Sequence, residues 1–155
     1  MPAMSTIFVS TDQSLLDFTW LIPALQSEPW GAVASAEDIR LRASKSLCFG
    51  VYERIDALGV YAGDTFTETI PSSIRQLGFA RVLTDGVSVS FLSDVLIDKL
   101  RRGEGLGTRL MECVLGHKDV KACHVLLGTK TAWLFYERMG FTAVDQPMMI
   151  RAPMA

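Results

Sequence analysis

A short glycine-rich run, Arg102-Gly103-Glu104-Gly105-Leu106-Gly107-Thr108, is the part of the chain best suited to bind a charged small molecule. It follows an apolar, strand-like run, Val95-Leu96-Ile97, and opens an amphipathic stretch typical of a helix. A glycine-rich turn between a strand and a helix presents bare backbone N–H groups at the positive end of the helix dipole. Such a turn binds phosphate, and Arg102 adds a cation. We therefore expect residues 102–108 to hold a phosphate-bearing cofactor.

Two familiar glycine motifs do not fit this run. A dinucleotide fingerprint, Gly-x-Gly-x-x-Gly, belongs to a strand–helix–strand unit and is followed by an acid about 20 residues later. Here the glycines alternate at 103, 105 and 107, and no such unit starts the chain. A Walker loop ends in Gly-Lys-Ser/Thr, whereas Gly107-Thr108 lacks the lysine. What remains is Arg-x-x-Gly-x-Gly, or a tight turn without a ligand.

The elements before this run can be predicted from apolar periodicity and capping residues. Residues 6–9 are typical of a short strand. Asp12 could cap a helix through residues 15–22, which Pro23 should kink or end because it lacks a backbone donor. Ser35 is a candidate N-cap for a second helix over residues 36–44.

The remaining elements alternate in a way that indicates a mixed sheet. Asp85-Gly86 is a strong hairpin signal. The segment 54–76 is less regular and predicts a strand with a long hairpin loop, a lid or a disordered connection. The order indicates an α/β fold, antiparallel first and gaining a parallel pair later. The expected strands cover residues 47–52, 77–83, 87–97, 125–127 and 141–150, and the expected helices cover residues 105–115 and 132–139.

The pattern Arg102-x-x-Gly105-x-Gly107 resembles the pyrophosphate loop of the GNAT superfamily of acyl-CoA-dependent N-acyltransferases. Residues 129–141, with Tyr136 before Gly140-Phe141, are similar to the helix that closes over the thiol end of the cofactor in that family. The resemblance covers residues 77–150 well and the N-terminal half in outline. It implies one acyltransferase domain over residues 1–155. The implied fold is a GNAT-like mixed sheet, antiparallel in its N-terminal part, with a splayed parallel pair toward the C-terminus and flanking helices.

The resemblance also implies the site and its co-substrate, acetyl-CoA. Backbone N–H groups of the loop would bind the pyrophosphate, and the pantetheine would pair with Leu96 and Ile97 at a bulge near residues 95–97. A strand N–H would stabilise the oxyanion. No role is assigned to the Glu104 side chain. The expected cofactor-binding residues are Val95, Leu96, Ile97, Arg102, Gly103, Glu104, Gly105, Leu106, Gly107, Thr108 and Tyr136.

Tyr136 and Asp94 are the expected catalytic residues. Tyr136 would protonate the departing thiolate, or it is a buried core aromatic. Asp94, beside the expected splay, would act as general base or amine anchor, unless it is a structural carboxylate and a water chain takes the proton. Trp30 and Trp133 are expected to contact the acceptor. Members of the closest-looking group, small bacterial and fungal acetyltransferases, usually carry Asp-Ala-His where this chain has Thr131-Ala132-Trp133.

Composition narrows the cellular setting. Hydrophobic residues make up 49% and charged residues 21% of the chain, and the net charge is −2, which argues against a general nucleic-acid binder. No apolar run reaches membrane-spanning length, and residues 1–5 do not resemble a signal peptide. The three cysteines and two histidines form no metal-ligand pattern and fit a reducing cytosol. We expect a cytoplasmic protein without metal, membrane or nucleic-acid partners.

The sequence thus predicts transfer of an acetyl group from acetyl-CoA to a primary amine by direct attack in a ternary complex. A small-molecule acceptor is favoured because a flap at residues 54–76 would narrow a peptide groove. Protein lysine or N-terminal amines remain an alternative acceptor, and a non-catalytic acyl-CoA-binding sensor an alternative function. Family members pair through strand edges or the final strand, so the resemblance is compatible with a homodimer.

Overall fold

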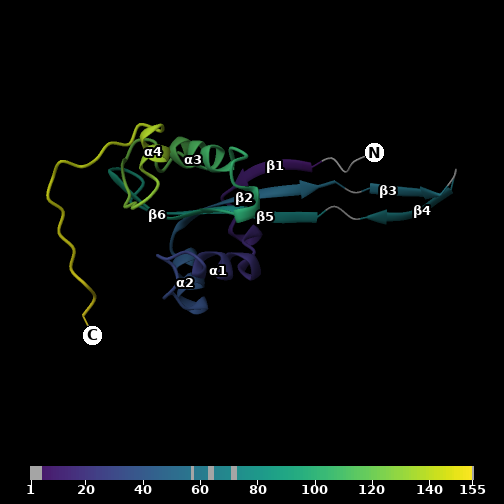
Figure 1. Ribbon diagram of the computed structural model, residues 1–155, viewed down its shortest axis with the longest axis horizontal. Helices are drawn as coiled ribbons and strands as arrows, with labels where there is room; N and C mark the ends of the chain where they lie inside the picture. Colours follow the sequence, from purple (N-terminus) through teal and green to yellow (C-terminus); the bar gives the residue numbers. More distant parts are fainter. Residues whose placement is uncertain (1–4, 57, 63–64, 71–72, 155) are drawn as a thin grey trace.

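The computed structural model describes residues 5–56, 58–62, 65–70 and 73–154 (Figure 1). Its centre is a five-stranded sheet in the order β1-β2-β5-β6-β7. All neighbouring pairs are antiparallel except β6 and β7, which are parallel. The predicted mixed sheet is therefore confirmed. The strands are β1 (Ser5–Ser10), β2 (Leu47–Ile55), β5 (Ser73–Thr84), β6 (Val89–Ile97) and β7 (His124–Leu126).

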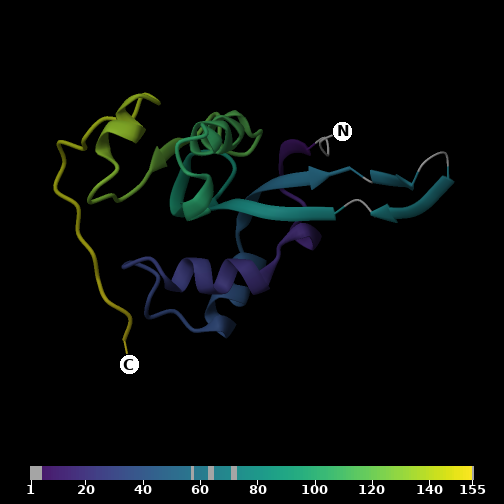
Figure 2. The same ribbon diagram turned by 45° about the vertical axis from the view of Figure 1, so that its right-hand side comes forward.

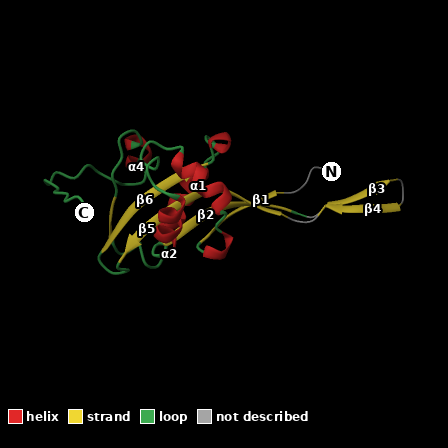
Figure 3. Ribbon diagram, turned by 90° about the horizontal axis from the view of Figure 1, so that it is seen from below, coloured by secondary structure: helices red, strands yellow, loops and turns green. Residues whose placement is uncertain are grey.

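Helices cover both faces of this sheet (Figures 1 and 3). Helices α1 (Phe18–Gln26) and α2 (Ala36–Ser44) lie on one face, and α3 (Leu106–Gly116) and α4 (Trp133–Glu137) lie on the other. Each face has its own apolar core. On the α3 side it is formed by Phe49, Val51, Leu77, Ala80, Val82, Leu92, Leu106, Leu110, Met111, Val114 and Val120. On the α1–α2 side it is formed by Leu21, Leu25, Ala34, Ile39, Ala43, Cys48, Phe79 and Leu96.

The N-terminal helices are only partly as predicted. Asp12 caps a 3₁₀ turn, Gln13–Leu15, and Asp17 caps α1 by accepting from Thr19 and Trp20 N–H groups. Pro23 does not end α1, which continues to Gln26. Burial of Leu21 and Leu25 on either side of the proline compensates for the one backbone bond that it removes.

Two predictions from local turn and cap chemistry are confirmed. Helix α2 begins at Ala36, because the Ser35 hydroxyl accepts from the Asp38 N–H at 3.0 Å. The β5–β6 hairpin turns at Asp85, whose carboxylate accepts from three following backbone N–H groups. Gly86 has a φ of 73°, in the left-handed region that glycine tolerates.

The segment between β2 and β5 is not a loop. Strands β3 (Leu58–Ala62) and β4 (Thr65–Ile70) pair as an antiparallel ribbon that extends away from the helices, beyond β2 and β5 (Figures 1 and 2). Its threonine, valine and aromatic residues favour strands, so a strand with a hairpin is the alternative nearest to the structure. The ribbon does not lie over either helix layer, so the prediction that this segment forms a flap narrowing a peptide groove is wrong.

The predicted final strand at residues 141–150 is also wrong. In the described part of the chain, residues 141–154 contain no strand, and Met149 and Ile150 are each 99% exposed. A run of apolar residues forms a strand only where a neighbouring edge is available to pair with it.

Among the helices of the described residues, none combines the length and apolar character that crossing a membrane requires.

Candidate functional site

Strand β6 leaves its parallel neighbour after three residues. β7 pairs only with Val89, Ser90 and Phe91, so the two strands part toward the C-terminal end of β6. The splay expected from the resemblance is therefore present. The register between β5 and β6 also shifts: Val82 faces Leu92 and Ala80 faces Val95, which leaves one extra residue on β6.

This bulge lies at Ser93 and Asp94, slightly before the predicted position at residues 95–97. A bulge places two consecutive side chains on the same side of a strand. Both the Ser93 hydroxyl and the Asp94 carboxylate contact Arg81 of β5 as a result. Strict alternation would have separated them.

A cleft of about 600 Å³ opens between the end of β6, the start of α3 and α4. It brings together nearly all of the predicted cofactor-binding residues, with the exception of Glu104. Arg101, Ala132, Phe135 and Arg138 also line it and were not predicted. Arg101 directly precedes the glycine-rich run, and Arg138 lies within residues 129–141. Their positive charge is the only feature of the sequence that could have identified them as cleft residues. The predicted residues in the lining are Val95, Leu96, Ile97, Arg102, Gly103, Gly105, Leu106, Gly107, Thr108 and Tyr136.

The glycine turn has the geometry of an anion cradle. Gly103 and Gly105 have φ values of 83° and 78°, a conformation that side chains disfavour. A Cβ at either position would meet no atom within 4 Å, so the space beside the turn is open. Gly105 is the N-cap of α3 without a side-chain cap, which leaves the first N–H groups of the helix for a ligand.

Two neighbouring arginines attach this turn to other elements. Arg101 donates from Nε to both oxygens of Glu104, at 2.9 and 3.0 Å, and from Nη1 to Glu53 of β2 at 3.0 Å. Arg102 donates from Nε to the Ile97 carbonyl and from Nη2 to Glu28, just beyond α1, at 3.0 Å. The Glu104 side chain thus holds Arg101 instead of facing the cleft.

Tyr136 reaches the cleft from α4. Its ring packs edge-on against Phe135 and Phe141, with centroids 5.1 and 5.6 Å away. Burial raises the pKa of the Tyr136 phenol, which therefore keeps its proton at neutral pH. Trp133 lies on the same helix, is 49% exposed, and is not part of the cleft lining.

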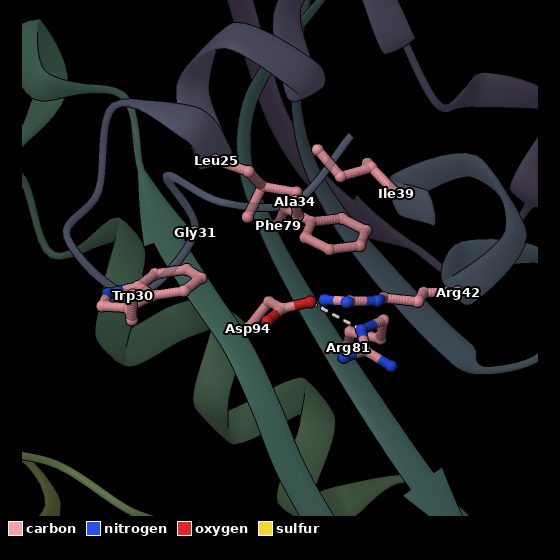
Figure 4. Close-up of a pocket in the computed structure, with 9 residues that line it drawn as sticks. All are labelled: Leu25, Trp30, Gly31, Ala34, Ile39, Arg42, Phe79, Arg81 and Asp94. Carbon is pink, nitrogen blue, oxygen red and sulfur yellow. Dashed lines mark hydrogen bonds and ion pairs between the residues drawn. The ribbon is translucent and has the colours of Figure 1, made fainter. Parts of the chain in front are cut away.

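A second, narrow pocket lies on the opposite face of β6, beneath α1 and α2 (Figure 4). Its volume is about 20 Å³, room for about one water molecule. Trp30, 50% exposed, forms its outer wall, as Figure 4 shows. Trp30 and Asp94 therefore meet in one pocket, whereas Trp133 does not line it. The lining residues are Leu25, Trp30, Gly31, Ala34, Ile39, Arg42, Phe79, Arg81 and Asp94.

The Asp94 carboxylate is held by side chains, not by backbone. Arg81 Nε lies 2.6 Å from Asp94 Oδ2, and Ser93 Oγ lies 3.2 Å from Oδ1. Arg81 donates further to the Ser46 and Ser93 hydroxyls. Behind this pair, burial raises the pKa of the Cys48 thiol to about 11, so that thiol stays protonated and is a poor nucleophile.

Comparison with known proteins identifies the family. Residues 67–143 match the model of the acetyltransferase (GNAT) domain. A Gibberella zeae protein described as a candidate acetyltransferase is 30% identical over 138 residues, which cover 85% of this chain and 77% of that protein. The chain belongs to the GNAT family of acetyltransferases.

Solved GNAT structures share the whole fold. A candidate GNAT acetyltransferase of Xanthomonas campestris pv. campestris superposes with a TM-score of 0.77 at 29% identity, covering 96% of this chain and 94% of that one. A GNAT family protein of Streptococcus pneumoniae gives a TM-score of 0.63 at 23% identity, covering 97% and 98%. The second likeness shows the fold alone.

GNAT membership makes this chain an acyltransferase, and the family takes acetyl-CoA as co-substrate. The cleft on the α3–α4 side fits such a molecule, because it combines an open glycine turn, uncapped N–H groups and cationic side chains. Among the described residues, no group of three or more His, Cys, Asp or Glu side chains is arranged to hold a metal ion.

Proposed function

We propose that this protein transfers the acetyl group of acetyl-CoA to the primary amine of a small molecule, by direct attack in a ternary complex. One observation carries the proposal. Two cavities on opposite faces of the sheet converge on the same stretch of β6: Asp94 lines the α1–α2 pocket, and Val95, Leu96 and Ile97 line the cleft. A donor and an acceptor bound on either side of this stretch would be brought within reach of each other.

The proposed donor site is the cleft. The N–H groups of residues 103–108 would bind the pyrophosphate, with Arg102 as a cation. The free edge of β6 at Leu96 and Ile97 would pair with the amides of the pantetheine as an added strand does, since β7 does not occupy it. A backbone N–H of the same edge would stabilise the charge that develops on the acetyl oxygen.

The proposed acceptor site is the α1–α2 pocket. Because its volume is only about 20 Å³, an acceptor would have to displace the half-exposed Trp30 side chain to enter it. Asp94 would accept a hydrogen bond from the amine through Oδ1, because Oδ2 is committed to Arg81. The neutral amine nitrogen forms a bond to the acetyl carbon and passes a proton toward Asp94, directly or through water. Trp133 lines neither the cleft nor the pocket, so it would contact only a part of an acceptor that extends beyond both.

Tyr136 is the proposed acid. As the carbon–sulfur bond breaks, the sulfur takes the proton of the Tyr136 phenol, and solvent returns one to the phenolate. The position of Tyr136 in the cleft lining and its protonated state at neutral pH support this role.

An amine on a protein is the alternative acceptor. The β3–β4 ribbon extends away from the pocket, so it does not exclude a peptide, whereas the narrowness of the pocket favours a small acceptor. The proposal also includes a cytoplasmic location, supported by the cysteines: Cys48, Cys113 and Cys123, all within the described residues, are free thiols.

Calorimetric titration with acetyl-CoA tests the proposal, with desulfo-CoA and NADH as comparison ligands and an amine screen with thiol release as the activity readout. Wild-type protein should bind acetyl-CoA with a Kd on the order of micromolar, and Gly105→Trp should lose that binding because the indole fills the space beside the turn. Gly116→Trp, at the far end of α3 where a Cβ also meets nothing, is the matched control. A folded wild type that fails to bind acetyl-CoA contradicts the donor site, and binding without turnover of any amine indicates a sensor.

A further inference from the structure

The charges around the α1–α2 pocket are unequal. Its ionisable lining residues are Arg42, Arg81 and Asp94, two cations and one anion. Glu28, two positions before Trp30, does not correct the imbalance because it is paired with Arg102. The pocket therefore carries a net positive charge toward whatever enters it.

Arg81 and Asp94 neutralise each other. Their side chains are only 10% and 17% exposed, and their charged atoms are 2.6 Å apart. The hydrogen bonds from Arg81 to Ser46 and Ser93 use one N–H of each of its two terminal nitrogens. Because its charge is paired with Asp94 and each of its nitrogens already has a partner, Arg81 attracts a ligand anion less than an unpaired arginine does.

Arg42 is the cation that remains. Within the described residues it has no ion pair and its side chain makes no hydrogen bond. Asp38, one helical turn earlier, instead accepts from the Ser35 hydroxyl at 2.9 Å. Figure 4 shows the Arg42 side chain extending from α2 toward the pocket that Asp94 and Arg81 also line, and the residue as a whole is exposed. A planar guanidinium in this position is suited to bind a carboxylate or phosphate through two parallel bonds.

We propose that this pocket selects a primary amine that also carries an anionic oxygen group, a carboxylate or a phosphate, bound by Arg42. This inference rests on the proposed function and names its acceptor class. The amine nitrogen of such a molecule lies at Asp94, and its apolar part packs against Phe79, Ile39 and the Trp30 ring. A simple alkylammonium ion has no anionic group that Arg42 could bind. The unpaired positive charge of Arg42 repels it instead.

Fragments that carry only the anionic group or only the amine show which of the two charges the pocket prefers. Wild-type protein, saturated with CoA so that the cleft is filled, is titrated with 3-phenylpropanoate, 2-phenylethylphosphonate and 2-phenylethylamine. The two anions should bind about tenfold or more tightly than the amine, as expected for a charged hydrogen-bonded pair. The carboxylate and phosphonate arms show which anion fits better.

Arg42→Gln should remove the preference for the anions. Arg40→Gln is the matched control: it removes the same charge from the same helix, but Arg40 lies over the Phe18 ring, 4.5 Å from its centroid, and not in the pocket lining. Thermal melting of both variants checks that they fold. Equal or tighter binding of 2-phenylethylamine, anion binding that survives Arg42→Gln, or no anion binding at all overturns the proposal.

The donor site is tested separately in the same samples. Loss of acetyl-CoA binding with retained, Arg42-dependent anion binding contradicts the proposed function and leaves an anion site. Intact acetyl-CoA binding with no preference for anions leaves the transferase and removes this acceptor class.

Discussion

At the scale of single residues, the Tyr136 phenol gives the most direct test of the chemistry. Tyr136→Phe should lower kcat by about a hundredfold, because it removes the proton for the leaving sulfur. The Kd for acetyl-CoA should change little, because the ring that packs on Phe135 and Phe141 is kept. Thiol release with an acceptor from the amine screen measures kcat, and calorimetry measures the Kd.

The pH profile sharpens this test. Because burial raises the pKa of Tyr136, its ionisation should not reduce the wild-type rate below about pH 10, the ordinary value for a phenol. Tyr52→Phe is the matched control, since the Tyr52 hydroxyl is buried, has no hydrogen-bond partner among the described residues and is not part of the cleft lining. An unchanged kcat for Tyr136→Phe would show that another group protonates the thiolate.

Side-chain partners are the part of the site that sequence reasoning missed. Asp94 could be selected because it precedes the Val95–Ile97 run, and Tyr136 because of its helix. The Arg81–Asp94 pair depends on the bulge at Ser93, which turns two successive side chains toward β5. No local pattern in the chain marks that extra residue, so neither the pair nor the free charge of Arg42 was visible.

At the scale of elements, Arg102 connects the cleft on the α3–α4 side to the segment that carries Trp30. Arg102 is one of the residues that line the cleft, and its guanidinium donates to Glu28. A phosphate in the cleft therefore competes with Glu28 for this cation. Glu28→Gln should strengthen acetyl-CoA binding by about two- to fivefold, since an exposed ion pair is worth up to about 1 kcal/mol.

Calorimetry at two salt concentrations measures this effect, which should shrink as salt screens the pair. Glu112→Gln, on the exposed side of α3 and without an ion pair among the described residues, makes the same charge change as a control. Weaker binding in Glu28→Gln would instead mean that Glu28 positions Arg102 for the phosphate.

Helices and turns could be predicted where a nearby cap or turn residue sets them. They could not be predicted where contacts with other segments decide the structure. The α2 cap at Ser35 and the turn at Asp85 needed only nearby residues. Pro23 sits inside α1 because buried leucines hold the helix on the sheet. Residues 58–62 and 65–70 form strands because they pair with each other, and the periodicity of each run alone did not reveal that pairing.

At the scale of the whole molecule, the sheet separates the proposed donor site from the proposed acceptor site. The α3–α4 side presents an open, phosphate-suited cleft, and the α1–α2 side presents a narrow, charged pocket. The end of β6 takes part in both, because the splay frees its edge and the bulge redirects its side chains. The irregular stretch of one strand therefore borders both the proposed donor site and the proposed acceptor site, while the two apolar cores keep it in place.

The C-terminal segment beyond Phe141 should contribute little to this arrangement. Phe141 packs against the α3-side core, whereas Val144, Met148, Met149 and Ile150 are all exposed. A chain that stops after Ala143 should therefore melt within about 2 °C of the full-length protein, because removal of exposed groups costs little free energy of unfolding. A chain that stops after Gly140 also loses Phe141 and its contact with Tyr136, and should melt several degrees lower. Scanning calorimetry compares the three. A fall of more than about 5 °C for the first truncation would show that residues 144–154 pair with the sheet in solution.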